Sequence, residues 1–156
     1  MTEAAQENTQ PTFNIEKLYV KDVSLEIPNA PQIFLTQESP QIEVQLHSQG
    51  DAVEDGVYEV VVTTTVTAKV GEKVMFLIEA KQAGIFQIRG VPNEEMEPIL
   101  AVVCPNILFP YLRELVSEMA VRAGFAPVLL NPINFDMLYQ QQKQQQAQTA
   151  AAATTH

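Results

Sequence analysis

The sequence of 156 residues contains no tryptophan, one cysteine and two histidines. Its single cysteine, Cys104, excludes an internal disulfide, as in proteins of reducing compartments. Because His47 and His156 are the only histidines, the paired His and Cys spacing of a zinc site is missing, and we expect no metal. Basic residues are also few, with nine Lys and Arg against nineteen Asp and Glu. The net charge of -10 disfavours nucleic acid as a partner. It favours basic partners or simply keeps the protein soluble.

Catalytic motifs are missing as well. The sequence has no glycine-rich phosphate loop and no G-x-S-x-G elbow, and its carboxylates are spread along predicted strand faces. Cys104 precedes Pro105 and has no basic neighbour in sequence to activate it, so we expect a buried apolar side chain instead of a nucleophile. The sequence therefore predicts a protein that is not an enzyme and has no cofactor.

No apolar run approaches the length of about eighteen residues that crosses a bilayer. The N-terminal residues 1–12 have neither a basic start nor an apolar core, so they do not resemble a secretory signal. We therefore expect a cytoplasmic protein that does not insert directly into a membrane. Its length fits one domain, predicted over residues 13–139, between a mobile leader (1–12) and a disordered polar tail (140–156).

Alternation of apolar and polar residues predicts four sequential strands, at 13–27, around 42–47, at 57–70 and at 73–88. Gly71 and Glu72 can close a hairpin between the last two strands, and 50–56 is rich in turn residues. Prolines make 28–40 a crossing loop, with Ile33, Phe34 and Leu35 as its anchors. In the first strand, strict alternation assigns one face to Ile15, Tyr19, Val23, Leu25 and Ile27, and the other to Leu18, Val20, Asp22, Ser24 and Glu26.

The second part of the chain has helical spacing. A helix can start at Asn93 or Glu94 and is expected to be interrupted by Pro105. A longer helix is predicted from Leu108 to Arg122, and a short last helix from Asn134 or Asp136. The fold class is therefore α+β, with a four-stranded antiparallel sheet followed by a long helix and a short C-terminal helix. Helices on one face would leave the other face exposed or paired with a second subunit.

An acidic face is the main candidate site from periodicity. Asp22 and Glu26 share a face of the first strand, and Leu77 and Glu79 share a face of the fourth. This pattern fits an ordinary solvated sheet face, and it also fits a docking surface for a small basic module. Periodicity does not distinguish the two interpretations.

Several strings of residues together are characteristic of one family. They are YVKDVSLEIPNAP at 19–31, VYEV at 57–60, GIF at 84–86, CPNILFPY at 104–111 and PINFD at 132–136. In this order they resemble the SecB protein-export chaperones of Gram-negative bacteria. The resemblance covers residues 13–139. Glu38 departs from it, since many family members carry a tryptophan at this position of the crossing loop.

The resemblance implies an ATP-independent holdase that binds unfolded preproteins and delivers them to the SecA motor of the Sec translocase. It also implies a homotetramer built as a dimer of dimers. Residues matching Asp22, Glu26, Leu77 and Glu79 form the family's surface for the zinc-bearing C-terminal segment of SecA. Residues matching Ile78, Ala80 and Gln82 affect tetramer assembly. Our candidates for the walls of the client groove are Phe34, Tyr111, Phe135 and Tyr139.

Two other functions fit parts of this pattern. A β-rich carrier could hold an apolar small molecule in an aromatic cavity, and it would be a monomer with a closed cavity. Within the family, a chaperone that guards the antitoxin of a toxin pair is the other alternative.

Overall fold

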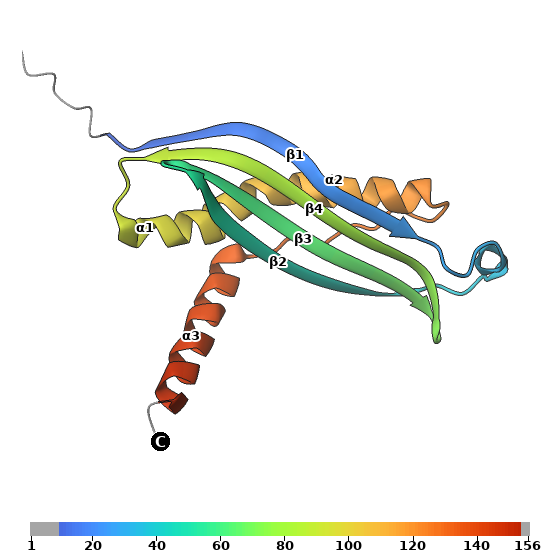
Figure 1. Ribbon diagram of the computed structural model, residues 1–156. Coiled ribbons are helices and arrows are strands. Elements are labelled where there is room, and N and C mark those ends of the chain that lie inside the picture. Colours follow the sequence, from blue (N-terminus) through green and yellow to red (C-terminus); the bar gives the residue numbers. More distant parts are fainter. Residues whose placement is uncertain (1–9, 154–156) are drawn as a thin grey trace, which may run out of the picture.

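The computed structural model describes residues 10–153, and its strands form one antiparallel sheet in the order β1-β4-β3-β2 (Figure 1). The strands are β1 (Thr12–Glu26), β2 (Gln41–Glu54), β3 (Val57–Val70) and β4 (Lys73–Arg89). The predicted four-stranded antiparallel sheet is confirmed. β2 is longer than predicted, because the segment from Gly50 to Glu54 continues its pairing with β3 and only Asp55 and Gly56 form the turn.

The two central strands alternate as their sequences predict. Val60, Val62, Val66 and Ala68 of β3 are fully buried on the face that carries the helices, as is Thr64 between them, and the odd-numbered residues from Val61 to Thr67 point to the opposite face. We call the face without helices the outer face. β4 follows the same rule, and the hairpin that joins it to β3 turns at Gly71, whose φ of 61° favours glycine. β-branched side chains suit this pleated, half-buried surface.

Two irregularities in β1 change which residues share a face. Its pairing with β4 shifts between Ile15 and Lys17 and again between Val20 and Asp22. Each shift adds one residue to β1 and reverses its alternation. The strict alternation predicted for this strand is therefore wrong in its first part. Leu18 and Val20 lie on the helix face, opposite Gly84 and Gln82, and Tyr19 lies on the outer face.

One continuous helix of 30 residues, from Asn93 to Arg122, follows the sheet. It consists of α1 (Asn93–Pro98), a π-helical segment (Ile99–Val103) and α2 (Cys104–Arg122). The predicted interruption at Pro105 is wrong. Cys104 donates its N–H to the carbonyl of Ile99, five residues earlier, and this wider turn lets the chain pass a proline that has no N–H to donate.

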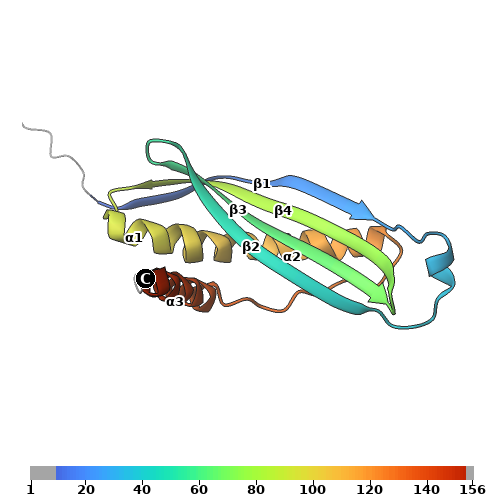
Figure 2. The same cartoon turned by 60° about the horizontal axis from the view of Figure 1, so that its bottom comes forward.

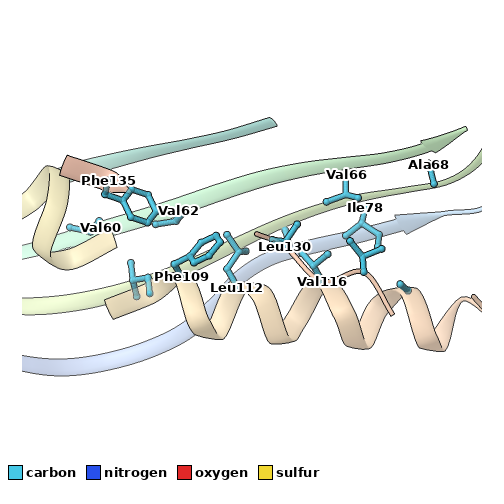
Figure 3. Packing of buried hydrophobic residues seen from close by; sticks show 14 of the residues in the cluster. Val60, Val62, Val66, Ala68, Ile78, Phe109, Leu112, Val116, Leu130 and Phe135 are labelled. Atoms are coloured by element: carbon cyan, nitrogen blue, oxygen red, sulfur yellow. The ribbon is translucent and has the colours of Figure 1, made fainter. Parts of the chain in front are cut away.

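This helix lies along one face of the sheet, as Figures 1 and 2 show from two sides. Leu112 and Val116 of α2 point towards the sheet and pack near Ile78 of β4 (Figure 3). Gly84 allows α2 to approach closely, because a Cβ there would lie 3.1 Å from Leu108 Cδ2. Burying each large apolar side chain stabilises the fold by about 1.5–3 kcal/mol, so this contact contributes strongly to stability.

By length and hydropathy the helix Asn93–Arg122 could also cross a membrane. A single helix of this kind is weak evidence, since the core helix of a soluble protein passes the same test. Here Leu108, Leu112 and Val116 are completely buried against the sheet. This packing supports the interpretation as a core helix.

The connector after α2 returns along the helix face, with Val128 and Leu130 buried, and leads into α3 (Phe135–Ala153) (Figure 2). The start of α3 is tied down by Phe135, which lies near Val60 and Val62 (Figure 3). The tail predicted to be disordered from residue 140 differs from the structure, where α3 continues to Ala153. Glutamine, lysine and alanine are good helix formers, and this segment contains neither glycine nor proline.

The crossing loop between β1 and β2 contains one short 3₁₀ helix, Gln32–Leu35. Of its three predicted anchors, Ile33 is buried, whereas Phe34 is 48% exposed and Leu35 is 83% exposed. Leu35 is therefore not an anchor. Phe34 stacks on Phe125 of the connector, with ring centroids 5.2 Å apart, and this contact fixes the loop over the end of α2.

Candidate functional site

The outer face of the sheet brings the four predicted docking residues together. Glu26 pairs with Leu77, and Ser24 between the two acids of β1 pairs with Glu79. Residues directly opposite in an antiparallel pair point to the same face. Asp22, Glu26, Leu77 and Glu79 therefore form one patch on β1 and β4, which we call the docking face.

The surroundings of the docking face are not uniformly acidic. Lys81 lies opposite Asp22. In the neighbouring strand β3, three threonines lie opposite Lys81, Glu79 and Leu77 and so extend three rows of facing residues across the sheet: Thr63, Thr65 and Thr67. On the far edge, Glu43 of β2 ends the row that begins with Glu26. The result is a flat polar surface with Leu77 as its apolar residue and carboxylates on both sides. Such a surface fits a small partner with basic and apolar groups.

Tyr19, Lys21 and Glu59 form a second cluster on the outer face. Strict alternation missed it, because it assigned Tyr19 to the face of Ile15 and Val23, which is the helix face. The Lys21 Nζ donates to Glu59 Oε1 at 2.6 Å, and the Tyr19 hydroxyl donates to Glu59 Oε2. Burial, with added effects of the bonded Glu59, raises the pKa of Tyr19 to about 12. The hydrogen bonds from Lys21 and then Tyr19 lower the pKa of Glu59.

The helix face carries two open grooves at opposite ends of β2. The first, the loop groove, has a volume of about 500 Å³ and lies between the crossing loop, β4 and the connector. Phe34 lines it beside Phe125, and Glu38 lies on its wall. Glu38 therefore places a carboxylate on the wall of this groove. Its lining is otherwise largely apolar, including Ile33, Ile42, Met75, Phe76 and Val128.

The second groove, the helix groove, also has a volume of about 500 Å³ and lies between β2, α1 and α3. Phe135 and Tyr139 line it together with Leu46 and Leu100. The Tyr139 hydroxyl is buried, and it has no hydrogen-bond partner among the residues described. Above its ring lies the Lys143 ammonium, 4.9 Å from the centroid, a cation–π contact that covers one face of the tyrosine.

β2 connects the two grooves. Ile42 lines the loop groove, Leu46 lines the helix groove, and Val44 lies between them on the same face, since the three pair with Ala68, Thr64 and Val66 of β3. Ile42 and Val44 are 45% and 46% exposed. We call Ile42, Val44 and Leu46 the β2 stripe. This apolar stripe joins the largely apolar loop groove to the helix groove, whose lining also includes polar residues such as His47 and Glu97, in one long surface along an edge of the sheet.

Comparison with known proteins identifies the family. The sequence profile of "Preprotein translocase subunit SecB" matches residues 6–146. The protein-export protein SecB of Dechloromonas aromatica is 61% identical over 137 residues, which are 88% of this chain and 90% of that protein. The chain belongs to the SecB family. The SecB protein of Methylobacillus flagellatus is 59% identical over 154 residues, 99% of this chain and 98% of its own length.

A solved structure supports the same fold. It is a Mycobacterium tuberculosis SecB-like chaperone in complex with a peptide from the HigA1 antitoxin, and it matches with a TM-score of 0.65. The two sequences are only 16% identical over 78% of this chain and 90% of that one. The family profile and the two close relatives above are those of SecB export proteins, so the predicted protein-export chaperone is confirmed. The comparisons favour it over the small-molecule carrier and the antitoxin chaperone.

Within this SecB fold, the remaining predicted residues lie apart from the grooves. Tyr111 is 46% exposed on α2 and lines neither groove, so a single chain does not bring the four groove candidates into one site. Ile78, Ala80 and Gln82 are buried on the helix face of β4. They cannot touch another subunit directly while α2 covers them. Cys104 is also buried, and burial raises the pKa of its thiol to about 12.

Proposed function

We propose that this chain is an ATP-independent holdase that binds unfolded preproteins along the β2 stripe and the two grooves. The observation that carries the proposal is the exposure of the apolar β2 stripe between two open grooves. Extended apolar surfaces of this kind usually mark a binding site in a soluble protein. A client side chain buried there gains about 1.5–3 kcal/mol, while ordering its backbone costs about 1–2 kcal/mol per residue. Tight holding therefore requires several client segments bound at once.

Refolding of a slow-folding preprotein tests this activity. Without nucleotide, an excess of the chaperone should slow refolding, because binding the unfolded state by mass action removes it from the folding reaction. A mature protein that folds quickly is the control and should be little affected. An unchanged refolding rate for the slow-folding preprotein would contradict the proposal.

The proposed partner at the docking face is the zinc-bearing C-terminal segment of the SecA motor. Asp22, Glu26 and Glu79 supply negative charge around Leu77, which suits a compact basic module. We expect Asp22→Lys with Glu26→Lys to abolish motor binding while client holding persists, since the β2 stripe is on the other face. Glu54→Lys with Glu72→Lys makes the same charge change at exposed positions near two hairpin turns, and this control should retain binding. Loss of both activities in the first variant would indicate general damage instead.

Assembly into a tetramer is part of the same proposal. The edge strand β1 exposes apolar side chains on the helix face, namely Phe13, Ile15, Val20 and Val23. A second copy could cover them, and substitutions at Ile78, Ala80 or Gln82 would affect assembly through the position of α2 above them. Light scattering should give four times the chain mass of 17.3 kDa. A monomer would argue against the tetramer.

The proposal involves no catalytic step, and it assigns the protein to the cytoplasm, where preproteins are available before export. The buried Cys104 supports a function without a catalytic step, since a thiol with a raised pKa is a poor nucleophile. The refolding assay therefore needs neither nucleotide nor cofactor.

A further inference from the structure

Asp22 and Glu26 of β1 point to the docking face only because of the irregularity at Lys21. Between the pairs Val20 with Gln82 and Asp22 with Lys81, β1 advances by two residues and β4 by one. Lys21 is the extra residue, and this is the geometry of a β-bulge. Residues before the bulge, such as Leu18, and residues after it, such as Leu25, can then both lie on the helix face although their numbers differ in parity.

Without this bulge the docking face would lose two of its acids. Continuing the alternation from Leu18 and Val20 would turn Asp22 and Glu26 towards the helix face. There they would lie opposite the buried side chains of Ala80 and Phe76, and Leu25 would point to water. Burying carboxylates without partners is unfavourable, so the arrangement without the bulge is disfavoured. The position of the bulge must also be fixed at one residue, since otherwise it could move along the strand.

Glu59 holds the residues around the bulge. Its side chain comes from β3 on the outer face, where Glu59 pairs with Ile85 of β4. One carboxylate oxygen accepts the Lys21 ammonium at 2.6 Å, and the other accepts the Tyr19 hydroxyl. The two donors flank Val20, the last regular residue before the bulge. The Glu59 side chain is only 20% exposed, so water screens this contact less than an ordinary surface ion pair.

We propose that Glu59 is a positioning residue for motor docking: by binding Lys21 and Tyr19 it fixes the β-bulge that turns Asp22 and Glu26 onto the outer face. This inference rests on the proposed function of the docking face. Glu59 itself lies beside the docking face and does not belong to it. Tyr19 and Lys21 act through the same contact.

Charge reversal separates positioning from simple charge effects. The probe is a synthetic peptide of the motor's C-terminal segment loaded with zinc, titrated against the full-length chaperone. Lys21→Glu adds negative charge near an acidic face, so long-range attraction alone would strengthen binding of a basic peptide. Positioning predicts the opposite, a loss of about three- to ten-fold, the range expected when a partly buried ion pair and its hydrogen bonds are broken.

The reciprocal variant and two controls complete the set. Glu59→Lys should weaken peptide binding similarly, and Lys21→Glu combined with Glu59→Lys should restore it to within about two-fold, because the swapped pair can form again. Lys17→Glu makes the same charge change on β1 but lies before the bulge, opposite Ile85. It should not weaken binding, and refolding assays should show client holding in every variant.

The strand register is measured independently of the motor. Leu25 lies opposite Ile78 in the native pairing, so a methyl NOE between them reports the register after the bulge. We expect this NOE to weaken in Lys21→Glu and to return in the swapped double variant. A full-strength NOE in both single variants, or peptide binding that becomes tighter in Lys21→Glu, would overturn the inference. Failure of the unmodified chaperone to bind the peptide would instead reject motor docking, while the NOE would still decide whether Glu59 fixes the bulge.

Discussion

Asp22 of β1 lies directly opposite Lys81 of β4 on the outer face of the sheet. A cation therefore stands inside the docking face, beside one of the two acids that are proposed to attract the motor. In antiparallel sheets, opposite charges in directly facing positions stabilise each other modestly. The same attraction reduces the negative potential available to a basic partner.

Removing this cation should tighten motor docking. We expect Lys81→Gln to increase the affinity for the motor's C-terminal segment by about two- to five-fold at low salt, because one opposing charge is lost. Calorimetry at two salt concentrations measures the effect, which should shrink as the salt screens it. Lys143→Gln on α3 is the matched control. Equal affinities for the Lys81→Gln variant and the unmodified protein would show that Asp22 does not act through its charge.

The contact between α2 and the sheet should dominate stability. Leu112 is completely buried, so Leu112→Ala is expected to lower the free energy of unfolding by about 2–5 kcal/mol, through lost burial and the cavity left behind. Urea unfolding followed by circular dichroism measures the change. Val53 is 60% exposed, and Val53→Ala should cost less than about 1 kcal/mol. Similar losses in the two variants would contradict this view of the core.

The strands show how far the sequence alone can predict this fold. Alternation assigned Val60 and Val62 of β3 to the core correctly, because a regular strand has only two faces. It failed for Leu18 and Tyr19, because one extra residue reverses every later assignment and a bulge has no strong signature in the sequence. The grouping of Asp22 with Glu26 survived, since both follow the bulge.

The helices show a similar limit. Pro105 normally ends a helix, but a preceding π turn accommodates it, and that turn depends on packing against the sheet. Among the candidate groove residues, Phe135 and Tyr139 line the same groove, and their sequence spacing indicates this, since residues four apart on a helix lie on the same side. Tyr111 could not be assigned from sequence, since aromatic residues on a helix can face a core, a groove or another subunit.

Cys104 should be unreactive in the folded protein. Burial raises the pKa of its thiol to about 12, so at pH 8 almost no thiolate is present, and the sulfur is also inaccessible. A disulfide reagent such as DTNB should modify the thiol only after unfolding in urea. Rapid modification of the native protein at pH 8 would contradict the buried position.

Tyr19 should ionise late in an alkaline titration. Its pKa is raised to about 12, and the group in an unfolded chain titrates near 10. The raised value means that its contribution to stability is complete below pH 10 and is lost as the pH rises through 12. The difference in absorbance between the unmodified protein and Tyr19→Phe isolates this residue. A midpoint near 10 would indicate that the Tyr19 hydroxyl is neither buried nor bonded to Glu59 in solution.

Two neighbouring residues of β2 can separate client binding from motor docking. Val44 lies on the helix face within the β2 stripe, and Gln45 lies on the outer face in the same row as Glu79. Val44→Lys puts a charge into the apolar surface and should weaken client holding several-fold, with motor docking retained, because an unpaired ammonium is costly to bury. Gln45→Lys adds the same charge one residue further on. It should leave client holding unchanged and weaken motor docking, since it partly neutralises Glu79. Refolding kinetics measure client holding, and peptide titration measures motor docking, in both variants. If each variant lost both activities to the same extent, the two faces of this sheet would not act separately.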